Sequence, residues 1–334
     1  MLDFFKRQKP AAKALEPPRE RADAVLQRLE WTVLKRLDGI LQGDHRTLMR
    51  GNGLDLADLR EYQHHDDVRH MDWNVTARLQ QPHVRVFTED RDMTAWFLLD
   101  LSPSVDFGSG AQRKSDVLLD FVGVLARLMG RHGNRVGAML WGAAGNRVLP
   151  ARGGRAQVLQ ILHRIAQAER DESGDGGVTR LADLLHAATH TVRQRCTVLV
   201  VSDFISEPGW EKPLGELALR HDVVAVRLFD ALELELPDLG LLTVRDAETG
   251  EQLLVDTGDA GFRQRYARIA AQREAELRES LGRAGVDTLE LATDGDVFNA
   301  VLRFVELRGR RARAGAGGRQ RLPAHMAQAA EGLA

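Results

Sequence analysis

The chain has 334 residues, 43% of them hydrophobic and 28% charged, a composition that can bury a sizeable core. Its formal net charge of −2 excludes a strong overall field toward nucleic acid or an anionic membrane. Cys196, the single cysteine, excludes a disulfide framework and a cysteine-based zinc site, which fits a reducing compartment.

The N-terminal part is predicted to hold a flexible lead and one helix. Residues 1–20 combine prolines with charges and lack the apolar core of a signal peptide. Residues 21–43 carry apolar side chains at helical spacing and end at a glycine, which predicts an amphipathic helix. Apolar runs nowhere approach the roughly 20 residues that cross a bilayer. We therefore expect a cytoplasmic protein with no membrane span and no nucleic-acid partner.

Residues 44–93 form a polar, irregular block in which arginines alternate with acidic residues. Its best strand candidate is "PHVRVF", residues 82–87. The alternating charges are Arg60, Glu61, Asp67, Arg69, Asp72 and Arg78. Because arginine pairs with carboxylates through two parallel hydrogen bonds, these residues can form a network that braces the block on the next domain. A docking surface for a partner is the other interpretation, and the sequence leaves both open.

After residue 93 the pattern becomes an alternation of strands and helices. Short, nearly continuous apolar runs occupy residues 94–100, 135–140, 196–203 and 222–229. Helical patterns separate them at residues 114–133, 155–168, 180–194 and 213–221. Such apolar runs suit strands that are covered on both faces. The alternation therefore predicts a doubly wound, mostly parallel α/β domain over residues 94–307.

The C-terminal part is predicted to complete this domain. Residues 246–252 are typical of a hairpin turn, and a long charged helix is expected at residues 259–283. A strand at residues 286–291 and a helix ending near Leu307 follow. Residues 308–334, basic and glycine-rich at their start, are predicted to be a disordered tail.

Polar residues follow two of the predicted strands. Asp100 ends the first apolar run and is followed by Ser102 and Ser104, while Asp203 ends the run at residues 196–203. Thr179 lies in a glycine-rich loop before a predicted helix. Parallel strands end at one edge of the sheet, where α/β proteins bind their ligands. Two carboxylates and three hydroxyls are hard oxygen ligands, so we expect one Mg²⁺ or Mn²⁺ ion there, with a position open to a partner's carboxylate.

Capping is the alternative interpretation of these side chains. Asp, Ser and Thr are common N-cap residues, so Thr179 can simply cap the helix that starts near Arg180. Asp106 is interpreted as a turn or cap residue and not as a ligand. His64, His65 and His70 are expected at the surface, because no helical pair of metal-ligating histidines is evident.

Two families resemble this pattern. The D-x-S-x-S triplet with Thr179 and Asp203 resembles the metal-ion-dependent adhesion site of von Willebrand factor A domains. The charged block resembles the signature of the bacterial family called domain of unknown function 58, whose members carry such a block before an A-like domain. The matching pieces are Gly53, Leu59-Arg60-Glu61-Tyr62, Asp66-Asp67-Val68-Arg69, Asp72-Trp73 and Thr76-Ala77-Arg78. The resemblance covers about residues 45–307.

The resemblance implies a function as well as a fold. Members of this family resemble companions of MoxR-type AAA+ ATPases that work in metal insertion, complex assembly or envelope-related processes. This implies a non-enzymatic adaptor with an A-like fold, which captures a carboxylate of the ATPase or of an unknown client through the metal ion.

Other functions are less well supported by the motifs. A metal-dependent hydrolase lacks a paired D-x-D with a nucleophile, because position 102 is serine, and no H-E-x-x-H occurs. "DFGSG" at residues 106–110 is not the G-x-S-x-G of a nucleophile elbow. Neither a P-loop nor a G-x-G-x-x-G after a strand is present, which disfavours nucleotide binding. A structural domain with an unused site remains the third alternative.

Overall fold

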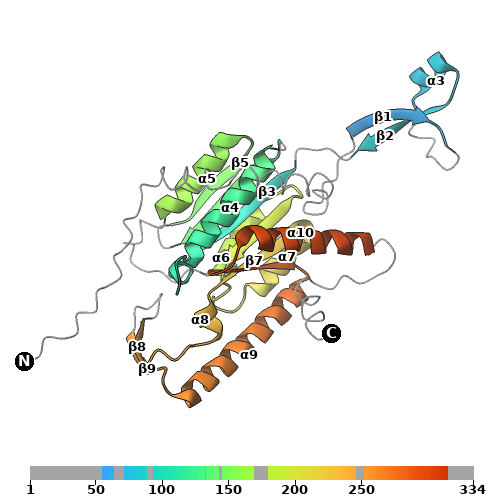
Figure 1. Ribbon diagram of the computed structural model, residues 1–334. Coiled ribbons are helices and arrows are strands. Elements are labelled where there is room, and N and C mark those ends of the chain that lie inside the picture. The colour runs from blue at the N-terminus through green and yellow to red at the C-terminus, as the bar shows by residue number, and fades with distance from the viewer. Residues whose placement is uncertain are drawn as a thin grey trace, which may run out of the picture.

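The computed structural model (Figure 1) describes residues 55–63, 71–88, 93–131, 133–142, 145–168, 180–245 and 252–314. The predicted lead and first helix, Thr179, the three histidines at positions 64, 65 and 70, and the tail beyond residue 314 lie outside the described residues. Within the described part of the chain, no helix is both long and apolar enough to cross a membrane.

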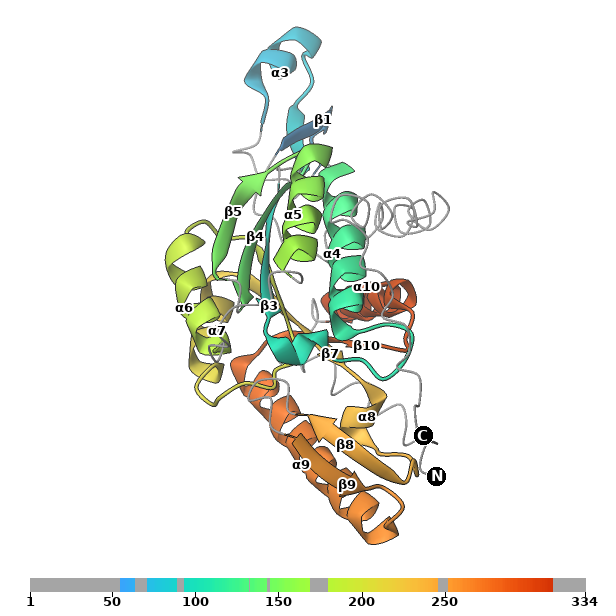
Figure 2. The ribbon, with the colours of Figure 1, turned by 90° about the vertical axis from the view of Figure 1, so that its left-hand side faces the viewer.

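A twisted sheet forms the centre of the molecule (Figures 1 and 2), and in the described residues it has six strands. Across the sheet these are β10 (Asp287–Ala292), β7 (Asp222–Phe229), β6 (Thr197–Ser202), β3 (Thr94–Leu101), β4 (Arg135–Gly142) and β5 (Arg147–Arg152). All neighbours are parallel except β4 and β5. The predicted doubly wound, mostly parallel α/β class is confirmed.

Helices cover both faces of this sheet (Figure 2). One layer holds α4 (Lys114–Arg131), α5 (Arg155–Ala168) and α10 (Val297–Ala314), and the other holds α6 (Leu181–Thr191), α7 (Glu211–Arg220) and α9 (Ala260–Ala284). Side chains alternate along β3, so Phe97 and Leu99 pack against the first layer. Trp96 and Leu98 pack against the second. This two-sided burial explains the nearly continuous apolar run in the sequence.

The edge strand β5 was not predicted. Its sequence "RVLPAR" contains Pro150, which lacks the N–H that an inner strand needs. Because β5 pairs only with β4 in the described sheet, the proline is tolerated there. Gly137 on β4 has a packing reason as well: it lies opposite Trp96, and a Cβ would come within 2.9 Å of the indole.

The C-terminal elements follow the predicted order. After β7 come the short helix α8 (Ala231–Leu234) and the antiparallel pair of β8 (Leu241–Arg245) and β9 (Gln252–Asp256), which confirms the hairpin. Helix α9 ends at Gly285, whose φ of 69° is the left-handed conformation that favours glycine. Helix α10 continues to Ala314 instead of ending near Leu307, so residues 308–314 are helical and not part of a disordered tail. Arg308, the first residue of this extension, forms ion pairs with Asp222 and Asp287 of the sheet.

The described part of the charged block differs from the irregular, packed segment that we expected. It contains β1 (Asp55–Glu61), α3 (Trp73–Leu79) and β2 (His83–Thr88), and the last of these confirms the predicted strand. Asp72 caps α3 by accepting the N–H groups of Asn74 and Val75. None of the residues of α3 is buried, and the β1–β2 pair extends away from the main sheet (Figures 1 and 2). Because side chains at positions 60, 67 and 69 lie outside the description, both interpretations of the block stay open.

Candidate functional site

Polar side chains gather where four adjacent strands of the described sheet end. Asp100 lies near the end of β3, Ser202 and Asp203 at the end of β6, Asp230 after β7 and Thr293 after β10. All five are buried. Because these strands are parallel, their carboxyl ends meet at one edge, which we call the carboxyl edge. Asp100 and Asp203 both lie at this edge, as the sequence pattern predicted.

Asp100 accepts its hydrogen bonds from neutral groups. Its Oδ1 accepts the backbone N–H of Ser102 at 3.0 Å, and its Oδ2 accepts the hydroxyl of Ser202 at 2.7 Å. Burial raises the pKa of Asp100 to about 6, and the nearby charge of Asp203 adds to this rise, although the hydrogen bonds oppose it. The Ser202 hydroxyl that bonds Asp100 belongs to the residue before Asp203, so the two buried aspartates lie at the ends of adjacent strands. A cation between them would relieve their repulsion.

Ser102 and Ser104 lie beside Asp100 because the chain turns there. Ser102 is extended, and the short 3₁₀ helix η2 (Pro103–Asp106) follows it, so the two hydroxyls meet at 3.0 Å. Both serines are buried. Asp106 has a different role, because its two oxygens accept hydrogen bonds from Arg113 at 2.8 Å and one of them accepts the Ser115 hydroxyl. It therefore braces the loop, in agreement with its interpretation as a turn residue.

Asp203 is held by the strained turn that follows β6. Its Oδ1 accepts the N–H of Ile205 at 3.0 Å. Phe204 adopts a φ of 58°, which is uncommon for a residue with a side chain, and its N–H bonds to the Ser202 hydroxyl. The phenyl ring packs on Trp210 with centroids 5.3 Å apart. This packing holds a conformation that costs about 1–3 kcal/mol and fixes the direction of the Asp203 carboxylate.

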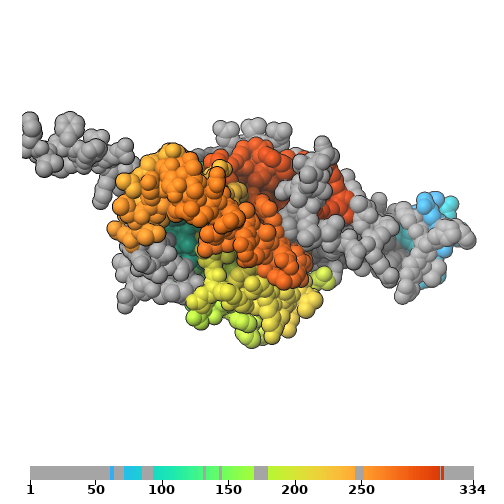
Figure 3. All heavy atoms as spheres, turned by 90° about the horizontal axis from the view of Figure 1, so that it is seen from below, coloured from blue at the N-terminus to red at the C-terminus, as the bar shows by residue number. Residues whose placement is uncertain are grey.

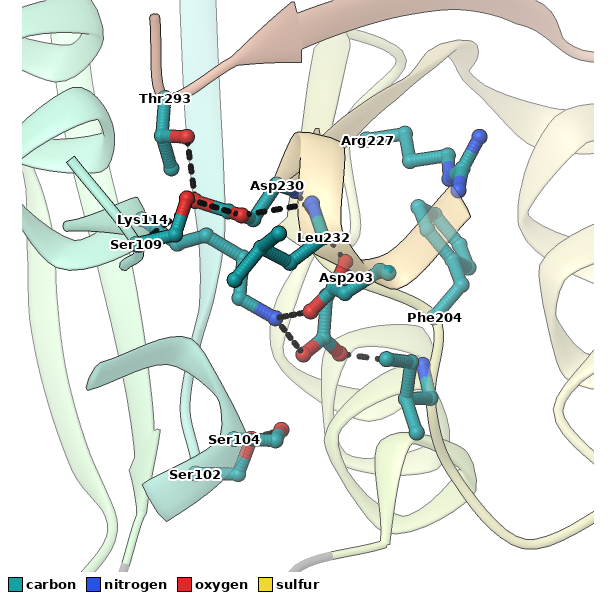
Figure 4. A network of polar contacts seen from close by, with 12 residues as sticks. Ser102, Ser104, Ser109, Lys114, Asp203, Phe204, Arg227, Asp230, Leu232 and Thr293 are labelled. Atoms are coloured by element: carbon teal, nitrogen blue, oxygen red, sulfur yellow. Dashed lines mark hydrogen bonds and ion pairs between the residues drawn. The ribbon is translucent and has the colours of Figure 1, made fainter. Parts of the chain in front are cut away.

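Lys114 is a member of this site that the sequence analysis missed. It is the first residue of α4, and its side chain is 1% exposed. Its Nζ donates to Asp203 Oδ2 at 2.8 Å and to Glu233 Oε1 at 2.6 Å (Figure 4). Burial alone would lower the pKa of Lys114, but the two carboxylates outweigh burial and raise it. A cation at a helix N-terminus is unfavourable because it opposes the helix dipole. The position of Lys114 at the start of a predicted helix was therefore the feature of the sequence that could have identified it.

Asp230 and Glu233 were missed as well. Asp230 caps α8 and accepts hydrogen bonds from the Ser109 N–H and hydroxyl at 2.9 and 2.6 Å, and from the Thr293 hydroxyl at 2.6 Å. Glu233 completes the capping box by accepting the N–H of Asp230. The signal for Asp230 was its place directly after an apolar run, which is the feature that singled out the other two aspartates.

The fifth predicted ligand, Thr179, lies outside the described residues. The neighbouring helix α6 begins at Leu181 with Arg180 as its N-cap residue, and the N–H of Leu181 donates to the hydroxyl of Ser206 at 3.1 Å. The assignment of Thr179 as a ligand therefore stays a prediction.

The chemistry of this donor set fits a small, hard cation. In the described part of the chain, no three His, Cys, Asp or Glu side chains are grouped to hold a metal ion. An ion at the carboxyl edge would therefore need the hydroxyls of Ser102 and Ser104 beside the two aspartates, and these four residues belong to the predicted set of five that also includes Thr179. Mg²⁺ is commonly held by one or two carboxylates together with neutral oxygens. Asp203 and Glu233 share the single charge of Lys114, so negative charge is in excess there.

The surface is hollowed where the region from β3 into α4 shows between neighbouring elements (Figure 3). Figure 3 shows atoms coloured teal, the colour of the region from β3 into α4, set back between orange residues of the α8–α9 region and yellow-green residues of α6 and α7. Two apolar side chains near the carboxyl edge are exposed to solvent: Phe107, which follows η2, is 40% exposed, and Ile205, which follows β6, is 55% exposed.

Comparison with known proteins identifies the family. The model of a family described as a protein of unknown function, DUF58, matches residues 58–276. The chain belongs to the DUF58 family. The uncharacterized proteins Rv1480 of Mycobacterium tuberculosis and Mb1516 of Mycobacterium bovis are each 37% identical over 292 residues, covering 87% of this chain and 91% of theirs. The family predicted from the arginine-rich block is thus confirmed.

The solved structures that resemble this DUF58 protein are distant in sequence. A conserved hypothetical protein, BatB from Bacteroides thetaiotaomicron, matches with a TM-score of 0.42 and 12% identity, covering 65% of this chain and 99% of that one. The SpRpn10 VWA domain matches with a TM-score of 0.37 and 11% identity, covering 64% and 95%. At these scores the fold assignment depends on the sheet order and the helix layers described above.

Proposed function

We propose that this DUF58 protein is a non-enzymatic interaction module that binds one Mg²⁺ or Mn²⁺ ion at the carboxyl edge and uses it to capture a carboxylate of a partner protein. Asp100, Ser102, Ser104 and Asp203 would hold the ion, with Thr179 as the predicted fifth ligand. The observation that carries the proposal is the buried, close pair of Asp100 and Asp203, in which Asp100 accepts hydrogen bonds from neutral donors.

Each group at the site has a distinct task in this proposal. The two aspartates supply negative charge, and the two serines supply neutral oxygens. The bound ion would supply a coordination position for an oxygen of the partner. The turn at Phe204 keeps the carboxylate of Asp203 directed into the site before any ligand arrives. Exposed Phe107 and Ile205 offer apolar contacts to residues beside the captured carboxylate.

The partner is proposed to be a MoxR-type AAA+ ATPase or a client that such an ATPase remodels. An aspartate or glutamate of the partner would reach the ion at the carboxyl edge. The biological process proposed is complex assembly, metal insertion or an envelope-related process, and this part of the proposal depends on the family resemblance alone.

Calorimetric titration of Mg²⁺ and Mn²⁺ tests the ion site. Wild-type protein should bind one ion, and Asp100→Ala should lose the heat of binding. Asp238→Ala is the control, because it removes an exposed carboxylate that is not in the predicted ligand set, and it should leave ion binding unchanged. Equal titration curves for wild type and Asp100→Ala would contradict the metal site.

A pull-down from the source cells tests the interaction. At least one partner should be captured with Mg²⁺, lost with EDTA and lost again with Asp100→Ala, while Asp238→Ala should retain it. Identification of a captured protein as an AAA+ ATPase would support the specific partner. If the captured proteins are the same with and without EDTA, metal-dependent capture is wrong.

A further inference from the structure

The side chain of Lys114 already places a positive charge at the proposed ion site. Its ammonium lies between Asp203 and Glu233, in contact with both (Figure 4). Asp203 belongs to the predicted ion-binding set, whereas Glu233 comes from α8 and does not. Lys114 therefore contacts one proposed metal ligand, Asp203, and one carboxylate that is not a proposed ligand, Glu233.

We propose that Lys114 competes with the divalent ion for Asp203, and that Glu233 retains the ammonium when the ion is bound. This inference rests on the proposed function, because it concerns the affinity and regulation of the same ion site. Lys114 would act as an internal cation that stabilises the carboxyl edge while no ion is present.

The geometry at Asp203 makes the competition direct. Its Oδ1 already accepts the N–H of Ile205, and its Oδ2 is the oxygen that contacts the ammonium. A carboxylate oxygen can accept more than one partner, but an ammonium and a divalent cation on the same carboxylate repel each other. Full ion binding at Asp203 therefore favours movement of Lys114 away from it.

Lys114 has a place to which it can move. A lysine ammonium is a compact charge on a flexible four-carbon chain, so it can change partners with little movement of the backbone. Glu233 is already 2.6 Å away and its side chain is 21% exposed. The ring of Phe107, with its centroid 5.8 Å from Nζ, adds a second favourable surface for the cation.

Replacement of Lys114 by methionine tests the competition. Methionine keeps a long, unbranched side chain and removes the charge. Titration of Mg²⁺ into Lys114→Met should show affinity about tenfold higher than in wild type, because the competing cation is gone. Lys212→Met is the matched control. Lys212 lies at the start of α7, the helix that follows β6 and Asp203, but its side chain is exposed. The Mg²⁺ affinity of this variant should equal that of wild type.

Thermal melting provides a readout that does not depend on titration heats. In chelator, Lys114→Met should melt below wild type, because Asp203 and Glu233 are left without their shared cation. Addition of Mg²⁺ should raise its melting temperature more than it raises that of wild type. Lys114→Gln, which keeps a hydrogen-bond donor, is measured in parallel and should show the same pattern to a smaller extent.

The outcomes separate this inference from the proposed function. If wild type and Lys114→Met bind Mg²⁺ with equal affinity, or the variant binds more weakly, competition is overturned while the ion site stands. If both Lys114 variants are unfolded with and without Mg²⁺, the lysine is a structural brace that the ion cannot replace, and competition is again overturned. If wild type, Lys114→Met and Lys212→Met all fail to bind, the proposed ion site itself is wrong.

Discussion

Both edges of the central sheet hold charged side chains, partly buried at one edge and largely buried at the other, and the two edges balance their charges differently. At the amino edge, where the strands begin, Asp222 of β7 and Asp287 of β10 both pair with Arg308 of α10. Arg311 adds a contact to Asp287 at 3.8 Å. Burial raises the pKa of Asp222, and Arg308 counteracts that rise. The arginines thus offset the carboxylates and tie the last helix to the sheet.

Among the described residues of the carboxyl edge, the carboxylates outnumber the cations that contact them. Lys114 forms ion pairs with both Asp203 and Glu233, while Asp100 accepts hydrogen bonds from neutral groups. A cluster whose charges cancel within the protein acts as a brace. A cluster with an excess of one sign is where the proposed ion would act, so charge balance as well as burial distinguishes the two edges.

The amino edge also holds a pair that resembles a reactive site. Cys196 Sγ lies 3.5 Å from His221 Nδ1, and both side chains are buried. Burial raises the pKa of the Cys196 thiol to about 12, and the charge of Asp222 adds to this. Burial also lowers the pKa of His221, with Arg220 contributing. A neutral thiol beside a neutral imidazole is not an activated nucleophile, which agrees with a structural role for this edge.

The largest expected effect breaks the balance at the amino edge. Arg308→Met leaves Asp222 and Asp287 without their main cation, and we expect the free energy of unfolding to fall by about 3 kcal/mol. Urea denaturation measures this loss, and Mg²⁺ affinity should not change. Arg283→Met is the control, because its pair with Glu279 is exposed on both sides and should contribute less than about 1 kcal/mol. A loss of similar size in both variants would remove the distinction between brace and surface pair.

The next effect concerns Asp230, the carboxylate of the carboxyl edge that neutral donors satisfy. Burial acts to raise its pKa, but hydrogen bonds from Ser109 and Thr293 outweigh burial and lower it below the ordinary 3.8. The folded state therefore binds this proton less readily than the unfolded state. Asp230 stabilises the fold above about pH 4, and this contribution is lost as the pH falls through its folded pKa.

Asp230→Asn should consequently cost about 2 kcal/mol at pH 7, and the difference from wild type should shrink below about pH 4. Urea denaturation at both pH values measures the two differences. Asp238→Asn, an exposed carboxylate, should change little at either pH. A penalty for Asp230→Asn that is the same at pH 7 and at pH 3 would show that the charge of Asp230 is not what matters.

A smaller effect on the free energy of unfolding is expected at the carboxyl edge, with opposite signs for replacements of Asp100 and Asp203. In chelator, Asp100→Asn should raise the free energy of unfolding by about 1 kcal/mol, because it removes a buried charge that Asp203 repels. Asp203→Asn should lower it, because Lys114 loses one of its two partners. Urea denaturation in chelator compares the two variants. Loss of stability in both would mean that Asp100 is already compensated and that the edge has no excess charge.

The last prediction concerns the reactivity of Cys196 and not stability. At pH 8 the native thiol should react with an aromatic disulfide reagent at least about a hundredfold more slowly than the unfolded protein does, since burial keeps it protonated. Absorbance of the released thiolate follows the reaction with and without urea. Rapid reaction in the native state would mean that the amino edge opens, and would weaken its description as a brace.

The sequence by itself determined the fold class and part of the site. Apolar runs covered on both faces, alternating with helical patterns, indicated the parallel sheet, because backbone pairing and burial leave a local periodicity. That inference placed Asp100 and Asp203 at one edge, since parallel strands share their carboxyl ends. The pattern could not show β5, whose proline is tolerated only because the strand lies at the edge.

Only the tertiary structure decided which charges meet. Lys114 and Asp203 are 89 positions apart, and Lys114 and Glu233 are 119 apart, so no local spacing connects them. Their contact depends on how the start of α4 packs over the ends of β6 and β7. Likewise, Arg308 falls within a segment that was predicted to be a basic tail, but it lies in α10 and pairs with Asp222 and Asp287. Periodicity fixes which face of an element is buried, whereas the partner of a long charged side chain is fixed by packing between distant elements.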